Sequence, residues 1–189
     1  DMRDSIPDLR LTLRDVDPSD VQDVLVKQQA DLAVSVIHSR MGDGLNAVEL
    51  MRLPMALLLP SKHKAKTLDD LLDDEGGVLT SKIPLVGLPV YEEVSQLFQK
   101  EIDQRGLNWP IGVEVDSLDG VQQFVRCGFG AGITVRIPGV DLPKGMKAID
   151  LDGFPPLVIG VIHQGTLKPI AREFLAAAEQ LASSLTSGA

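Results

Sequence analysis

The sequence predicts an α/β fold, because strand-like and helix-like patterns alternate along nearly the whole chain. A continuous β-prone run at 32–37 is typical of a strand covered on both faces, and the runs at 55–59 and 157–164 also predict strands. Apolar residues spaced by three and four occur between such runs and indicate helices that bury one face. We therefore expect largely parallel strands joined by right-handed helical crossovers.

The most complete unit of this kind spans residues 114–135. Ser117 is placed to cap a helix, whose buried face would carry Val121, Phe124 and Val125. Gly128 supplies the positive φ that ends this helix, and Gly130 and Gly132 bracket a short strand that lies close to another backbone. Such a unit exposes a helix N-terminus beside strand ends, which is where open α/β sheets bind small anions.

The other elements follow from similar patterns. Alternating leucines predict a half-buried strand over 8–16, and Asp17 with Pro18 starts a helix over 18–28. Thr67 caps a short, solvated helix with the acidic pairs of residues 69–70 and 73–74. In chain order we further expect a strand at 78–80, a helix at 90–104, a strand at 146–151 and a last helix from Pro169 that buries Ile170, Phe174, Leu175, Ala178 and Leu181.

Composition limits the possible functions. The 189 residues suffice for one domain or two small lobes, and no apolar run approaches the roughly 20 residues that cross a bilayer. The one cysteine, Cys127, excludes an internal disulfide and a thiolate metal cluster, and we expect it to be a small core residue. A formal charge of −9 would repel a phosphate backbone, so any DNA contact belongs to another segment. We expect a cytoplasmic protein without membrane contact, metal or cofactor.

Four stretches in order resemble the effector-binding domain of LysR-type transcriptional regulators. They are IPDLRLTLRDV at 6–16, ADLAVSVI at 30–37 with Gly44 and Leu45 after it, PMALLLPSKHKAKTLDDLLDD at 54–74, and VDSLDGVQQFVRCGFGAGI at 115–133. The resemblance covers almost the whole chain. It implies two Rossmann-like lobes, similar to type 2 periplasmic binding proteins, with lobe I at 1–59 and 162–189 and lobe II at 60–161.

The resemblance also implies what lies outside this sequence. In that family the domain opens with a strand and a helix that carries a Ser or Thr facing the effector, and a winged helix-turn-helix lies upstream. We expect this chain to start inside that first helix, so lobe I would lack its first strand and DNA would be bound only by a segment absent from this chain. The resemblance further implies homodimers or tetramers of the intact regulator, which we expect to pack through the helices at 18–28 and 90–104.

Candidate effector-binding residues follow from the resemblance, which places the effector between the lobes, and from residue chemistry. Thr80 and Ser81 follow a strand, where hydroxyls and backbone N–H groups hold a carboxylate, although they equally suit a turn. Ser117 is first a helix cap, and the first-turn N–H groups, from Leu118 onward, remain for a ligand.

Three further candidates follow strand ends. His38 and Ser39 follow the strand at 32–37 and are either ligand contacts or solvated loop residues. Arg136 follows the strand at 133–135 and offers a positive charge to an anion, or else forms a surface ion pair. For His63 and His163 we expect packing or solvent roles.

These observations predict a sensor domain that binds a small polar or anionic metabolite and passes a rearrangement to a DNA-binding segment. No nucleophile elbow, Walker-type phosphate loop or His-Glu-x-x-His motif is present, so an enzyme is disfavoured. A periplasmic solute-binding protein of similar fold is the alternative, and it would carry a signal peptide where a regulator carries a helix-turn-helix.

Overall fold

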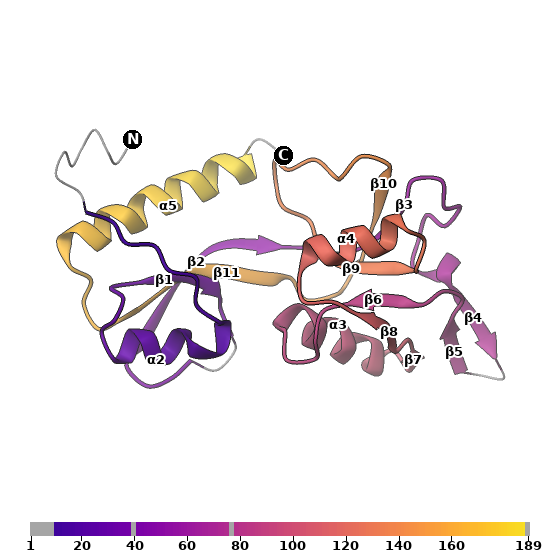
Figure 1. Cartoon of the computed structure of the whole chain (residues 1–189), viewed down its shortest axis with the longest axis horizontal. Coiled ribbons are helices and arrows are strands. Elements are labelled where there is room, and N and C mark those ends of the chain that lie inside the picture. Colours follow the sequence, from indigo (N-terminus) through magenta and orange to yellow (C-terminus); the bar gives the residue numbers. More distant parts are fainter. Residues whose placement is uncertain (1–9, 39–40, 76–77, 188–189) are drawn as a thin grey trace. The chain divides into compact units, whose positions relative to one another are not determined.

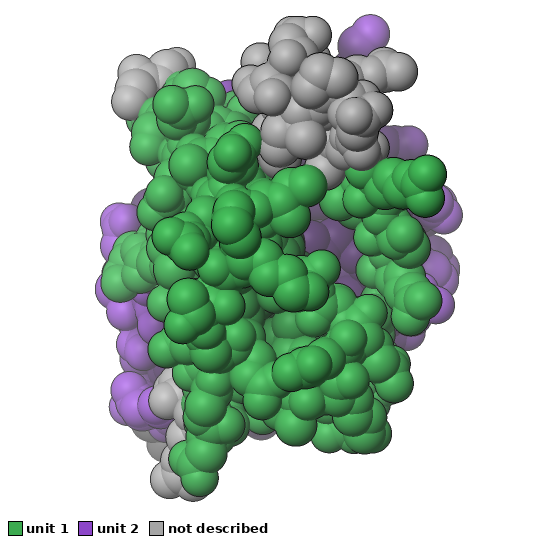
Figure 2. Space-filling view, turned by 90° about the vertical axis from the view of Figure 1, so that its left-hand side faces the viewer, with its two compact units in different colours: residues 1–52, 158–189 green, residues 53–157 purple. Residues whose placement is uncertain are grey.

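The computed structural model describes residues 10–38, 41–75 and 78–187. The chain folds into two compact units, coloured separately in Figure 2. Unit 1 comprises residues 1–52 and 158–189, and unit 2 comprises residues 53–157. The lobe boundaries expected from the sequence, after residues 59 and 161, lie a few residues further along the chain.

Unit 1 is a three-stranded sheet with a helix on each face (Figure 1). Its strands are ordered β1-β11-β2, and β1 runs antiparallel to β11. Helix α2 packs one face, where Val21 and Leu25 bury themselves against Ile162, and α5 lies over the other. The elements are η1 (Pro18–Asp20), α2 (Val21–Val26), β1 (Ala33–Val36), β2 (Leu45–Leu53), β11 (Leu157–Gln164) and α5 (Pro169–Ser187).

Two sequence predictions for unit 1 are wrong. Residues 10–16 form no strand, because none of their backbone groups is paired with another described segment, and Leu11 and Leu13 are exposed. A strand exists only as part of a hydrogen-bonded ladder, so alternation alone did not produce one. In α5 the residues most deeply buried are Ala171 and Ala182, whereas the expected core residues Ile170 and Leu181 are exposed.

Unit 2 contains a five-stranded sheet ordered β10-β3-β9-β6-β8, with α4 on one face and α3 on the other (Figure 1). Strand β6 is parallel to both β8 and β9, while β3 is antiparallel to β9 and β10, so the sheet is mixed rather than parallel. A smaller sheet is ordered β4-β5-β7. The elements are β3 (Met55–Pro60), η2 (Asp69–Leu71), β4 (Leu72–Glu75), β5 (Val78–Ser81), β6 (Leu85–Gly87), α3 (Glu93–Gln104), β7 (Leu107–Asn108), β8 (Ile111–Glu114), α4 (Leu118–Arg126), β9 (Ala131–Val135) and β10 (Met146–Asp150).

The core of unit 2 forms where the apolar runs predicted it. Residues Met55–Leu59 of β3 are all buried, because α3 and α4 cover the two faces of the sheet. Below the sheet Phe98 stacks on Phe154, at 5.6 Å between ring centroids, and packs edge-on against Trp109. The indole N–H of Trp109 donates to the carbonyl of Ile83 at 2.9 Å, which satisfies the polar atom of this buried ring.

The helix and strand predicted at 114–135 form, but Phe124 is exposed rather than on the buried face of α4, and Gly132 lies within β9 rather than before it. Helix α4 is capped by Ser117 and followed by Gly128 with φ of 84°. Asp73 and Asp74 lie on strand β4 rather than on a helix, because the helix before them is a single 3₁₀ turn, and its N-cap is Leu68 rather than Thr67. Cys127 is exposed, so it is not a core residue. Within the described residues, no helix combines the length and the apolar character needed to cross a membrane.

Candidate functional site

The carboxyl ends of three parallel strands lie at one edge of the larger sheet of unit 2. Strand β6 ends at Gly87, opposite Glu114 at the end of β8, and β9 runs beside β6 in the same direction. The loop 88–92, the segment 115–117 and Arg136 follow these strand ends. Open α/β sheets bind ligands at this edge, so the sheet order assembles a candidate site from residues distant in sequence.

The N-terminus of α4 contributes hydrogen-bond donors to this edge. The Ser117 hydroxyl oxygen accepts from the N–H of Gly120 at 3.2 Å, and the Ser117 carbonyl accepts from the N–H of Val121 at 3.0 Å. The backbone N–H groups of Leu118 and Asp119 have no acceptor among the described residues. Two first-turn donors at the positive end of a helix dipole are therefore open to an acceptor such as a carboxylate.

The loop after β6 forms a second part of the site that sequence reasoning missed. Ser95 is buried and donates its hydroxyl to the Leu88 carbonyl at 2.8 Å, while the Gln96 amide donates to the Tyr91 carbonyl at 3.1 Å. These bonds fix a loop whose tip residues, Val90 and Tyr91, are 73% and 68% exposed. The sequence contained a signal for this loop, because the loop lies between a strand and a helix. The same position is what selected Ser117 as a candidate.

Arg136 supplies a positive charge at this edge. It also forms a surface ion pair, which was the alternative role predicted for it. Its Nε lies 3.7 Å from Oδ1 of Asp150, which is longer than a hydrogen bond. The Arg136 side chain is 44% exposed and the Asp150 side chain 66%, so solvent weakens their attraction. Asp116 and Asp119 are exposed near the α4 N-terminus, and the charge around Ser117 is therefore mixed.

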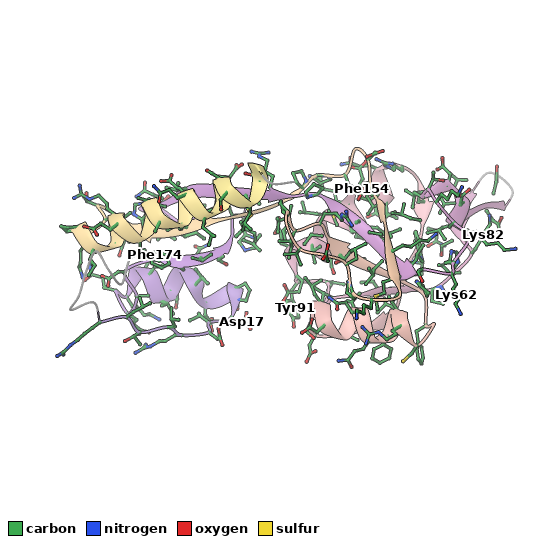
Figure 3. The ribbon with its side chains drawn as sticks, turned by 90° about the horizontal axis from the view of Figure 1, so that it is seen from above. Asp17, Lys62, Lys82, Tyr91, Phe154 and Phe174 are labelled. Carbon is green, nitrogen blue, oxygen red and sulfur yellow. The ribbon has the colours of Figure 1, made fainter. Side chains whose placement is uncertain are left out.

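Thr80 and Ser81 lie elsewhere in unit 2. They belong to β5 in the smaller sheet, where Thr80 is paired with Asp73 and Asn108. Because Ser81 precedes β6, it sits toward the amino end of that strand, whereas Ser117 follows the carboxyl end of β8. Figure 3 shows Lys82, the next residue, at the far end of unit 2 from Tyr91. Ser117, Leu118 and Arg136 therefore follow strand ends at the same edge of the larger sheet, whereas Thr80 and Ser81 do not.

The remaining candidates do not add to this edge. His38 follows β1 in unit 1, and Ser39 lies outside the described residues. The Nδ1 atom of His63 accepts from the backbone N–H of Ala65 at 3.2 Å, which orders the loop after β3, and His163 is buried in β11. Among the described residues, no three His, Cys, Asp or Glu side chains converge as a metal site would require.

Several solved structures with the same fold are LysR family regulators. HinK, a LysR family regulator from Pseudomonas aeruginosa, matches with a TM-score of 0.81 at 20% identity, over 97% of this chain and 63% of HinK. The BenM effector-binding domain with its effector benzoate matches at 0.77 and 14% identity, over 96% of this chain and 82% of that domain. Full-length CbnR complexed with target DNA matches at 0.71 and 14% identity, over 96% of this chain and 60% of CbnR. This chain thus spans less than two thirds of HinK and CbnR.

The family assignment comes from the sequence itself. The family model described as the LysR substrate binding domain matches residues 1–183, while no match was found among curated proteins. The mixed α/β fold is that of LysR effector-binding domains, which resemble type 2 periplasmic binding proteins. These are regulatory domains and not enzymes, which confirms the prediction that the chain is no enzyme. The chain belongs to the LysR substrate-binding domain family.

Proposed function

We propose that this regulatory domain binds its effector at the edge of unit 2 formed by Ser117, Leu118 and Arg136, and that the effector is a small polar or anionic metabolite. The observation that supports this best is the pair of first-turn N–H groups, on Leu118 and Asp119, that have no acceptor among the described residues. A carboxylate placed there accepts both bonds and gains from the helix dipole.

The charges around this helix N-terminus favour an effector with a single carboxylate. Arg136 attracts an anion, but Asp116 and Asp119 repel one, so several negative charges would be opposed at short range. The BenM domain of the same fold is described with benzoate, which carries one carboxylate. The exposed Val90 and Tyr91 at the loop tip offer apolar contact to the uncharged part of such a molecule.

The signal would pass to DNA through a segment outside this chain. A ligand that binds one arrangement of the protein better than another shifts the population by that difference in affinity. A DNA-binding regulator acts in the cytoplasm, where we place this domain. The involvement of His38 and Ser39 in unit 1 stays a prediction. An upstream signal peptide in place of a helix-turn-helix would favour the solute-binding alternative.

We also propose that the intact regulator assembles as a homodimer or tetramer in which α3 packs on a second copy. A cavity of about 470 Å³ runs along α3 and is lined by both apolar and polar residues, including Val90, Gln99, Lys100 and Ile111. Reversing the charge of Lys100 by Lys100→Glu should lower the dimer fraction in sedimentation velocity. The matched exposed control, Lys62→Glu, should leave it unchanged; equal effects would reject this surface.

A thermal-shift screen against monocarboxylates, amino acids and sugar phosphates tests the proposed function. A ligand at about a hundred times its Kd adds roughly 2.7 kcal/mol of stability. Arg136→Gln should weaken any carboxylate that shifts the melting temperature, because it removes the nearby cation. The matched control Arg52→Gln, which removes a cation paired with Glu49 in unit 1, should leave that affinity unchanged. No shift from any compound in the folded chain would contradict the proposal.

A further inference from the structure

The loop that follows β3, residues 61–66, carries a lysine at every second position. Lys62, Lys64 and Lys66 are exposed, whereas Ala65 between them is 5% exposed and His63 is half-buried. Figure 3 shows Lys62 on the outside of unit 2. Because exposed and inward residues alternate, the loop presents three ammonium groups to solvent in succession.

Hydrogen bonds hold the backbone of this loop in place. The N–H of Ser61 donates to the carbonyl of Gly145 at 2.8 Å, and Nδ1 of His63 accepts from the N–H of Ala65 at 3.2 Å. From β10 the ammonium group of Lys147 donates to the carbonyl of His63 at 2.6 Å and to the carbonyl of Ala65. A partner that binds the loop therefore does not have to order its backbone, which lowers the entropic cost of binding.

A fourth exposed lysine, Lys144, lies beside the loop, because the next residue, Gly145, accepts the bond from Ser61. Within the described residues no ion pair joins any of these four lysines to an acidic side chain. Basic residues elsewhere do form such pairs, namely Lys27, Arg52, Lys82, Arg105, Arg136 and Lys168. In a chain with a net charge of −9, the four lysines form a local excess of positive charge that is open to a partner.

Acidic side chains limit the length of the anion that this surface can hold. Asp69 and Asp70 follow the loop, and Asp141 precedes Lys144 by three residues; all three are exposed. A nucleic-acid backbone carries its charges well beyond four lysines and would meet these carboxylates and the rest of an acidic chain. A short segment with only a few negative charges is opposed least, so the charge pattern favours an acidic peptide over nucleic acid.

The spacing of the lysines indicates the conformation of that peptide. In an extended peptide, side chains at alternate positions point the same way and lie about 6.6 Å apart. Carboxylates at alternate positions can therefore reach successive lysines of a loop that also exposes every second side chain.

We propose that the loop 61–66, together with Lys144, is a docking surface for a short acidic segment of a partner protein, bound extended with carboxylates at alternate positions. Strand β3 runs antiparallel to β9, so the loop that follows β3 lies at the amino end of β9. The proposed effector site lies at the carboxyl end of the same strand. The docking surface is therefore at the opposite edge of the sheet and does not depend on the effector site.

The test titrates the 189-residue chain into a fluorescein-labelled peptide and follows anisotropy at low salt. The probe carries aspartate at four alternate positions, separated by serine, and the control peptide carries asparagine in place of each aspartate. We expect saturable binding of the probe, binding of the asparagine peptide at least about tenfold weaker, and loss of probe binding as sodium chloride is raised, because exposed ion pairs are screened by salt.

Two variants of the chain with the same net charge make the result specific. The first combines Lys62→Gln, Lys64→Gln and Lys66→Gln, and it should weaken the probe about tenfold, because each exposed pair contributes a fraction of a kcal/mol.

The matched control removes three exposed cations from unit 1 by combining Lys27→Gln, Arg52→Gln and Lys168→Gln. It lowers the net charge of the chain equally and should bind the probe within about twofold of the original chain.

Three outcomes would overturn the inference: no saturable binding of the probe, equal binding of the two peptides, or equal weakening by the two variants. Tighter binding of a labelled DNA duplex than of the probe, lost in the loop variant, would assign the surface to nucleic acid and would also overturn it. So would self-association at low salt that the loop variant abolishes, because the partner would then be a second copy. If the loop variant does not fold, the comparison of the two peptides on the unaltered chain still decides.

Discussion

Position 132 requires glycine because α4 lies very close to β9 at this point. A Cβ at this position would lie 2.5 Å from Cγ1 of Val121 and 2.6 Å from Cγ2 of Val125, both of which are buried. These methyl groups cannot move aside without shifting the helix. The same helix presents the first-turn N–H groups of the proposed effector site, so one missing side chain helps to position the site.

The substitution Gly132→Ala should lower the free energy of unfolding by about 1–3 kcal/mol, because a side chain is forced into a packed core. Urea denaturation measures this value. Gly42→Ala is the matched control, since its Cβ would come too close only to the flexible end of Gln22 and would lie at an ordinary 3.8 Å from Cδ1 of Leu45. It should change stability by no more than about 0.5 kcal/mol. Equal effects of the two substitutions would show that α4 does not pack as described.

Ser95 is a second residue with a local structural role, because its hydroxyl holds the loop at the end of β6. Replacing it by Ala should cost about 1–3 kcal/mol, because the Leu88 carbonyl is left unpaired in a buried region. Ser184→Ala is the matched control, because it removes a similar serine-to-carbonyl bond on an exposed helix surface and should cost much less. Chemical denaturation of the two variants compares them, and a Ser95→Ala protein as stable as the control would contradict this role.

Among the elements, the turn that leads into η2 depends on a single carboxylate. Asp70 accepts hydrogen bonds from the backbone N–H groups of Lys66 at 2.7 Å and Thr67 at 3.1 Å. These bonds favour the charged form and hold the pKa of Asp70 below its ordinary value. The N-cap of η2 is Leu68, one residue after the predicted Thr67, although the Thr67 hydroxyl oxygen accepts from the N–H of Asp70 at 3.4 Å.

Acid should therefore loosen this turn. A carboxyl group with a lowered folded-state pKa stabilises the fold fully above its unfolded pKa, and that contribution disappears as the pH falls through the folded-state value. We expect hydrogen exchange at the amides of Lys66 and Thr67, corrected for intrinsic rates, to accelerate as the pH is lowered below about 4. Asp70→Asn should abolish this dependence. A pH-independent exchange pattern in the unaltered chain would contradict the assignment.

The elements also show which predictions a sequence supports. Ser117 and Gly128 were predicted correctly because a helix cap and a positive φ are determined by neighbouring residues. Residues 10–16 had the alternation of a strand but no partner to pair with among the described residues. The loop after β6 was missed, and Thr80 and Ser81 were grouped with Ser117 although they lie in the smaller sheet, because which loops share one edge depends on strand order and direction, which local patterns do not contain. An effector contact by Thr80 and Ser81 stays a prediction.

At the scale of the whole molecule, the net negative charge predicts how this chain behaves toward DNA, which the family assignment alone does not. The chain carries 27 acidic and 18 basic side chains. We expect no binding of this 189-residue chain to double-stranded DNA at low salt in a gel-shift assay, because binding to phosphates requires positive contacts. Salt-sensitive binding would show that this domain contacts DNA itself.

The central claim is that the effector binds at the carboxyl ends of β6 and β8 in unit 2. Amide chemical shifts measured by NMR, during titration with a carboxylate found in the thermal-shift screen, test it most directly. The account predicts the largest changes at Leu118 and Asp119, with further changes in the loop 88–92. Changes centred on Thr80 and Ser81, with none at Leu118 and Asp119, would contradict it.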